Sequence, residues 1–248
     1  MIPLDSDFIA LALDGEIPAE DNKGKSFLRL EETGYVSSLR EKDGIWTKIF
    51  APGNKPGVGH NHEDKGSFIV EYNGEQIFTD PGMISYGDAG SRALKMCDFH
   101  NMLLPAGTAA RPHPRNPFDG FYTPEGVGDE ERLHLKMELT ATFDGFYEKW
   151  ERSLDSEGPE ELTVTDCYRL KEGRGVSALL QTWGKVEEKE GEVRIIGEKA
   201  CCTFRLPEGV SLEVKSHVFR GKELRTLCLY KAGEEGTLRI EMRFEPRA

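Results

Sequence analysis

The sequence predicts an all-β protein, an antiparallel β-sandwich of about a dozen strands. Short segments alternate apolar and polar residues with a period of two, and few windows of helical length keep a 3.6-residue period. Gly, Asp and Asn separate these segments, as expected of turns between strands. The predicted strands are 35–39, 45–50, 67–72, 75–79, 133–143, 146–154, 162–170, 177–183, 193–196, 201–206, 211–219, 224–231 and 237–244.

The order of these segments predicts one domain behind a short lead-in. The sequence up to about Lys25 is polar and shows no regular pattern, so we expect residues 1–30 to be a linker or an irregular lead-in. Residues 31–248 then form the β-sandwich domain. A chain of 248 residues is long enough to bury a substantial core.

The net charge of −12 argues against a general binder of nucleic acids or anionic membranes. No apolar run approaches the roughly 18 residues that cross a bilayer, and the first residues resemble no signal peptide. We therefore expect neither a nucleic acid nor a membrane as partner. The segment 91–115 is locally basic, because Asp98 is its only acidic residue.

The cysteines do not predict a disulfide framework. There are 5, an odd number, and they form no C-x-x-C motif. Buried free thiols are the simplest interpretation.

Three histidines predict a metal site. His60 and His62 form an H-x-H pair, and His100 follows later in the chain. In a strand, residues two apart point to the same face, so two imidazoles can meet one ion. A pair of surface histidines is the alternative.

A hairpin supplies a carboxylate for this site. Asn73-Gly74 is the preferred pair for a two-residue type I′ turn. With this turn Tyr72 faces Glu75, Val70 faces Ile77 and Ser67 faces Asp80. Asp80 then returns to the end of the hairpin where His62 enters, which predicts a His/His/Asp metal site.

The same stretch carries a family resemblance. The sequence from His60 to Phe68, HNHEDKGSF, resembles the H-x-H-x-D-x-x-S-F block of heparinase II/III-like polysaccharide lyases. Further family motifs follow in the same order: Asn73-Gly74, Asp80-Pro81-Gly82, Tyr86, Arg92 and His100-Asn101. The resemblance spans Gly34 to Asn101, and it departs from the family at Met102, where Thr is common.

The resemblance implies roles for single residues. His62, Asp80 and His100 match the family's zinc ligands, so Zn²⁺ is the expected cofactor. His60 matches the histidine that faces the substrate cleft and is the expected catalytic residue. Arg92, which matches an arginine near the cleft, and Asn61 are assigned to substrate binding.

The resemblance also implies a reaction, β-elimination in an acidic, uronate-containing polysaccharide such as a glycosaminoglycan or alginate. In the family, a catalytic Tyr and a His or Asn come from an N-terminal α/α toroid. No such helical segment precedes Gly34, so we expect the toroid as a partner, in a longer protein or as a separate chain. The family's usual location is periplasmic, in the cell envelope or secreted.

Two other functions remain open. One is a non-catalytic carbohydrate-binding or structural sandwich that keeps zinc for stability. The other is a cupin-like metalloenzyme, which also uses H-x-H on strands. A cupin places a Glu a few residues after the second His, whereas Glu63 is too close and Glu71 too far, so the cupin is the weakest of the three.

Overall fold

The computed structural model describes residues 26–31, 33–53, 62–82, 87, 90–112, 124–143, 145–219 and 221–247. In these ranges the chain forms 17 strands, three short 3-10 helices and no α-helix. All strand pairs are antiparallel. No helix in the described ranges is long and apolar enough to cross a membrane. The predicted all-β antiparallel fold is confirmed.

The strands form three sheets. The five-stranded sheet has the order β1-β2-β3-β4-β5: β1 (Phe27–Leu30), β2 (Tyr35–Lys42), β3 (Ile45–Ala51), β4 (Ile69–Tyr72) and β5 (Glu75–Phe78). The eight-stranded sheet has the order β12-β13-β14-β17-β10-β9-β8-β7: β7 (Glu125–Gly128), β8 (Leu133–Glu138), β9 (Tyr147–Ser156), β10 (Glu161–Leu170), β12 (Lys185–Lys189), β13 (Glu192–Ile196), β14 (Ala200–Arg205) and β17 (Glu235–Pro246).

The four-stranded sheet has the order β15-β16-β11-β6: β6 (Leu103–Ala106), β11 (Gly175–Thr182), β15 (Val210–Phe219) and β16 (Lys222–Ala232). Two of the 3-10 helices, η1 (Ala93–Lys95) and η2 (Cys97–Phe99), lie directly before β6. The third, η3 (Thr140–Phe143), connects β8 to β9 and takes the second half of the segment 133–143 that was predicted as strand.

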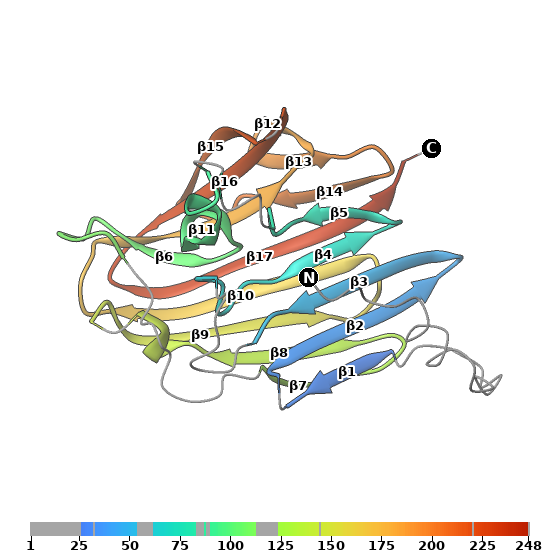
Figure 1. Cartoon of the computed structure of the whole chain (residues 1–248), viewed down its shortest axis with the longest axis horizontal. Coiled ribbons are helices and arrows are strands. Elements are labelled where there is room, and N and C mark those ends of the chain that lie inside the picture. The colour runs from blue at the N-terminus through green and yellow to red at the C-terminus, as the bar shows by residue number, and fades with distance from the viewer. Residues whose placement is uncertain are drawn as a thin grey trace, which may run out of the picture.

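The five-stranded sheet lies over the eight-stranded sheet (Figure 1). Buried apolar side chains of both sheets belong to one hydrophobic cluster. Tyr72 of β4 stacks on Phe244 of β17 at 5.6 Å between ring centroids. Buried polar groups also cross the interface: Arg40 of β2 donates to Ser156 of β9 at 2.6 Å. The period-2 pattern of the sequence thus corresponds to one face of each sheet turned into the sandwich.

The two smaller sheets meet at the end of β5. The backbone N–H of Thr79 donates to the carbonyl of Gln181 in β11 at 2.9 Å. The four-stranded sheet is also tied to the eight-stranded one, since the hydroxyl of Tyr147 in β9 donates to the carbonyl of Leu103 in β6 at 2.9 Å. All three sheets contribute to one hydrophobic core.

The predicted hairpin forms, but its register changes after two pairs. Asn73 and Gly74 have φ of 52° and 72°, as a type I′ turn requires, and Tyr72 faces Glu75. A bulge between Val70 and Glu71 then shifts the pairing by one residue. Val70 therefore faces Phe78, and the predicted pairing of Val70 with Ile77 is wrong. Ser67 and Asp80 lie outside the two strands.

Four strands were not predicted: β1, β6, β7 and β12. β6 contains a proline, β7 contains two glycines and β12 is highly charged, so none shows a clear apolar alternation. β12 is almost entirely exposed, with only Val186 partly buried. β1 lies within residues 1–30, so the sheet extends into the segment predicted as lead-in.

The prediction of free thiols is confirmed for all 5 cysteines. The prediction of burial holds for Cys97, Cys201, Cys202 and Cys228, whereas Cys167 is only partly buried.

Candidate metal centre

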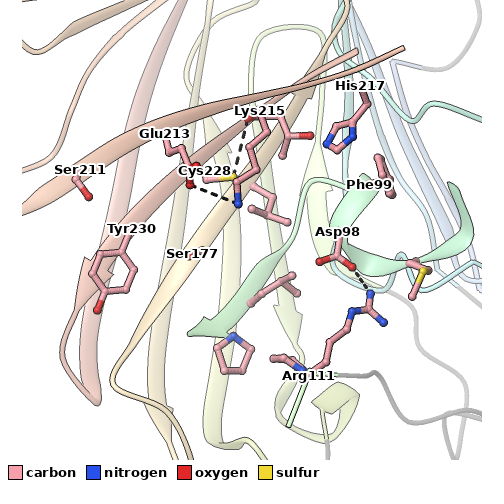
Figure 2. Close-up of a pocket in the computed structure, with 16 residues that line it drawn as sticks. Asp98, Phe99, Arg111, Ser177, Ser211, Glu213, Lys215, His217, Cys228 and Tyr230 are labelled. Atoms are coloured by element: carbon pink, nitrogen blue, oxygen red, sulfur yellow. Dashed lines mark hydrogen bonds and ion pairs between the residues drawn. The ribbon is translucent and has the colours of Figure 1, made fainter. Parts of the chain in front are cut away.

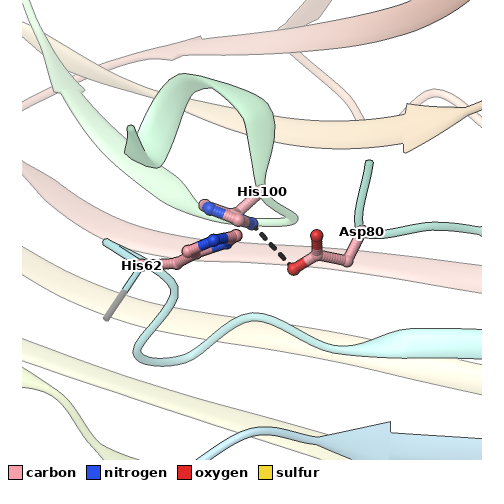
Figure 3. A group of neighbouring side chains, drawn as sticks. All are labelled: His62, Asp80 and His100. Carbon is pink, nitrogen blue, oxygen red and sulfur yellow. Dashed lines mark ion pairs between the residues drawn. The ribbon is translucent and has the colours of Figure 1, made fainter. Parts of the chain in front are cut away.

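Three of the predicted ligands lie together. His62 enters from the loop before β4, Asp80 follows β5, and His100 follows η2. Their possible ligand atoms all lie within 4.8 Å of one another, and the three side chains point toward one another (Figure 3). The two imidazole rings are 5.3 Å apart between centroids. The fold thus brings two imidazoles and a carboxylate to one point, although the hairpin register differs from the predicted one.

The His100 side chain has polar atoms that the described protein groups do not satisfy. It is fully buried, and neither ring nitrogen has a hydrogen-bond partner among the described residues. Nδ1 lies 3.2 Å from Oδ2 of Asp80, close enough for an ion pair but not aligned as a hydrogen bond. Buried polar atoms are rarely left without a partner, and an imidazole nitrogen facing a carboxylate and a second imidazole fits a metal ion.

The protonation states favour metal binding. Burial, followed by the charge of His100, lowers the pKa of His62, which favours the neutral imidazole. Burial alone would raise the pKa of Asp80, but the contacts with His100 and the N–H of Gly82 lower it below its ordinary value. A neutral imidazole and an ionised carboxylate are the forms that coordinate metals.

The number of ligands leaves one position open. Two imidazoles and one carboxylate provide three of the four ligands of a tetrahedral ion. Ligand atoms about 2.0–2.2 Å from such an ion are roughly 3.3–3.6 Å apart. The observed limit of 4.8 Å is wider than this, so the side chains must close in by about an ångström around an ion.

Asn101 fixes the segment that carries His100. Its side-chain amide donates to the carbonyls of Phe68 and Thr79, and its Oδ1 accepts the backbone N–H of Gln181 at 2.7 Å. Its own N–H donates to Ser67 Oγ at 3.1 Å. Asn101 therefore joins the segments that hold His62, Asp80 and His100, which explains why an asparagine follows the histidine.

A buried ion pair supports the same segments from the eight-stranded sheet. Arg152 of β9 faces Asp166 of β10 with Nε–Oδ1 and Nη2–Oδ2 distances of 2.8 and 2.9 Å. The remaining Nη1 donates to the carbonyls of Gly66 and Asn101, both at 2.6 Å. One guanidinium thus connects the loop after His62 to the residue after His100.

The segment from His62 to Lys65 is also tied to η1 and η2. The carboxylate of Glu63 accepts the N–H of Cys97 at 2.9 Å, and the N–H of Glu63 donates to the carbonyl of Lys95 at 2.8 Å. Lys65 donates to the carbonyl of His62 at 2.8 Å. These bonds fix the backbone on both sides of the metal centre.

Of the remaining predicted site residues, only Arg92 is among the described ones. Arg92 is exposed at the start of η1 and makes no ion pair with Asp64 or Asp80. His60, the predicted catalytic residue, and Asn61, a predicted substrate-binding residue, lie outside the described residues.

Sequence reasoning missed the residues that support the centre, mainly Arg152, Asp166 and Gln181. A signal was present for the ion pair. Arg152 stands between Trp150 and Leu154, and Asp166 between Val164 and Tyr168, at positions where the alternation calls for apolar side chains. A charged residue at an inward position of each of two consecutive strands indicates a buried pair.

The fold and the site together define a β-sandwich with a candidate two-histidine, one-carboxylate metal centre at the junction of its sheets. The family described as "Heparinase II/III-like, C-terminal" matches residues 22–226, most of the chain. The chain belongs to this family.

Solved structures of similar fold agree with this assignment. A structure titled "Heparinase III-BT4657 gene product" superposes with a TM-score of 0.70 at 16% identity, and the match covers 96% of this chain and 38% of that one. The heparan sulfate lyase HepC from Pedobacter heparinus gives a TM-score of 0.64 at 14% identity, covering 89% of this chain and 36% of that one. The chain thus spans well under half the length of these enzymes. No curated protein matches the sequence.

Proposed function

We propose that this chain is the β-sandwich part of a zinc-containing polysaccharide lyase that cleaves uronate-containing polysaccharide by β-elimination. The observation that carries the proposal is the meeting of His62, Asp80 and His100 in a member of the heparinase II/III-like family. The similar heparinase III and heparan sulfate lyase structures support the substrate class.

Zinc suits the ligand set better than the hard cations. Ca²⁺ and Mg²⁺ prefer oxygen ligands, whereas two imidazoles with one carboxylate are typical of zinc. When bound, the ion supplies a positive charge and a fixed point that joins three segments of the chain. His62 and His100 bind it through neutral nitrogens and Asp80 through its carboxylate.

The residues of this chain supply part of the chemistry. β-elimination at a uronate needs a base for the C5 proton, neutralisation of the carboxylate, and an acid for the leaving oxygen. His60 serves as one acid–base group, Arg92 neutralises the substrate carboxylate, and Asn61 takes part in substrate binding.

These groups do not complete the reaction by themselves. One acid–base group typically contributes about 10²- to 10⁴-fold, while enzymes reach about 10⁶-fold or more. A helical toroid, in a longer protein or as a separate chain, supplies the remaining groups and closes the cleft. The match to only 38% of the heparinase III chain supports a further domain.

The proposal is tested with alginate, heparan sulfate, chondroitin and hyaluronan, following the ultraviolet absorbance of the unsaturated uronate. We expect negligible product from the chain alone. We expect product from a chimera in which this chain replaces the β-sandwich of heparinase III, and loss of that product with His60→Ala.

Two results contradict the proposal. One alternative is that a tyrosine of this chain, such as Tyr86 or Tyr122, replaces the base of the toroid. Turnover by the chain alone, abolished by Tyr86→Phe or Tyr122→Phe, would show that the chain carries a complete active site. A chimera that folds and binds zinc but forms no product from any of the polymers would favour a non-catalytic, zinc-stabilised sandwich.

A further inference from the structure

A hollow of about 660 Å³ lies on the four-stranded sheet, separate from the metal centre. Its floor is formed by alternate residues of neighbouring strands, including Ser177 of β11 and Thr226 and Cys228 of β16. The residues between them, such as Leu227 and Leu229, are fully buried in the core. The hollow therefore occupies the face of the sheet that is turned away from the core.

The walls come from two directions (Figure 2). One wall is strand β15 with Glu213, Lys215 and His217, and the other is η2 with the segment around Arg111. A volume of this size lies within the roughly 300–1,000 Å³ that is usual for small-ligand sites.

The charges along the walls are paired with one another. Arg111 forms an ion pair with Asp98, and Nζ of Lys215 lies 3.4 Å from Oε2 of Glu213. Each of these cations thus faces a carboxylate of the same wall. A polyanion gains little from such a surface, because it has to compete with the carboxylates already there.

The same surface offers both donors and acceptors to an uncharged ligand. Carboxylates accept hydrogen bonds from hydroxyl groups, the guanidinium and ammonium donate to them, and the hydroxyls of Ser177 and Ser211 can do either. Hydrogen bonds that involve an ionised group are stronger than neutral ones. A ring with many hydroxyl groups matches this pattern.

Aromatic rings at both ends suit the apolar face of such a ring. Phe99 and His217 pack edge to face at 5.0 Å between centroids, and Tyr230 is 37% exposed at the other end. Aromatic side chains combine a large apolar surface with a polar edge or tip.

We propose that this hollow is a binding site for an uncharged sugar unit of one or two rings. It differs from the proposed lyase site in ligand charge and in position, and it does not depend on the lyase proposal. The site shares one segment with the metal centre: Phe99 lines the hollow, and His100 is the next residue. Thr226 also donates to Gln181 at 2.7 Å, and Gln181 donates to the carbonyl of His100 at 3.3 Å.

The test is titration of the full chain by calorimetry and by ligand-observed NMR. The neutral probes are N-acetylglucosamine, its β-1,4 disaccharide, cellobiose and methyl galactoside, and the anionic probes are glucuronic acid and a heparin disaccharide. We expect at least one neutral sugar to bind, with an affinity that does not change between low and high salt. The anionic probes should bind more weakly.

Variants locate the binding. Tyr230→Ala removes a ring of the hollow, Ser177→Leu fills its floor, and Lys215→Ala removes an exposed donor. Each substitution should weaken the affinity for the neutral sugar about tenfold or more. Trp46→Ala is the matched control, because Trp46 is 46% exposed on the five-stranded sheet and does not line the hollow.

Four results would overturn the proposal: no neutral probe binds, the anionic probes bind more tightly, the variants bind as the unchanged protein does, or Trp46→Ala weakens binding equally. Cooperative melting of each variant shows whether it is folded. If Ser177→Leu does not fold, Lys215→Ala and Tyr230→Ala carry the test, since both residues are exposed on the surface.

Discussion

Arg152 and Asp166 face each other across β9 and β10 as a two-point ion pair, and both side chains are almost completely buried. The guanidinium also holds the carbonyls of Gly66 and Asn101, the backbone on either side of the candidate metal centre. Each of the three guanidinium nitrogens of Arg152 donates at least one hydrogen bond. These bonds compensate for the free-energy cost of burying the positive charge. The core of the sandwich and the geometry of the site therefore depend on the same residue.

Replacing this arginine should be strongly destabilising. Arg152→Met leaves the carboxylate of Asp166 buried without its partner and frees two carbonyls, so we expect the free energy of unfolding to fall by about 3–5 kcal/mol. Urea denaturation measures it. Arg239→Met is the matched control, because Arg239 pairs with Glu241 at 2.8 Å on the exposed face of β17, and about 1 kcal/mol or less is expected there. Equal losses in the two variants would show that burial of the pair has no consequence.

Zinc should copurify and stabilise the fold. Elemental analysis of protein purified without chelator should give about one zinc per chain, because one tetrahedral site binds one ion. Ligand at about 1,000 times its Kd stabilises by about 4 kcal/mol, and each kcal/mol changes the Tm of a domain of this size by about 2–4 °C. Chelation should therefore lower Tm by about 10 °C.

Variants identify the ligands of that zinc. His62→Ala and His100→Ala should abolish zinc binding and match the Tm of the chelated protein. His134→Ala should keep both zinc and Tm, because His134 pairs with Asp155 at an exposed position and no third ligand joins them among the described residues. Protein that contains no zinc and melts unchanged after His62→Ala would rule out the centre.

Replacing Gly74, the second residue of the Asn73-Gly74 turn, should destabilise the protein. Gly74 has φ of 72°, where a Cβ is strained, while no atom lies closer than 4.0 Å to the position of that Cβ. Gly74→Ala should therefore cost about 1–2 kcal/mol through backbone strain alone, measured by urea denaturation. Gly158→Ala is the control: it also has open space, but its φ is not positive, so the change should be near zero. A cost at Gly158 as large as at Gly74 would contradict this explanation.

Stability should fall in alkali through the buried thiols. Burial raises the pKa of the Cys202 thiol well above its ordinary value of 9.0. The unfolded chain loses this proton as the pH rises past 9, while the folded chain keeps it. The contribution of the Cys202 thiol to the free energy of unfolding is therefore constant below pH 9 and falls as the pH rises above it. Urea denaturation at several pH values should show a loss of up to about 1.4 kcal/mol per pH unit from this thiol.

Cys202→Ala should make that decline shallower. Cys167→Ala, at a partly exposed position of β10, is the control and should leave the decline closer to that of the unchanged protein. An identical slope in all three proteins would show that the Cys202 thiol does not contribute.

The sequence by itself determined the local features of this protein. The period-2 alternation placed most of the strands, because adjacent residues of a strand point to opposite faces whatever the strand pairs with. The Asn73-Gly74 pair specified its turn, since few residue types adopt positive φ readily. The order of motifs from His60 to Asn101 was sufficient to indicate the family and the ligand types.

Only the tertiary structure decided how these pieces are joined. The bulge between Val70 and Glu71 shifts the pairing of β4 with β5, and no turn residue in the sequence marks it. The bond from Gln181 to Asn101 and those from Arg152 to Gly66 and Asn101 join residues 51 to 86 positions apart. Alternation and turn preferences act over a few residues, whereas these contacts depend on which sheets pack together, so the support of the metal centre became visible only in the folded sandwich.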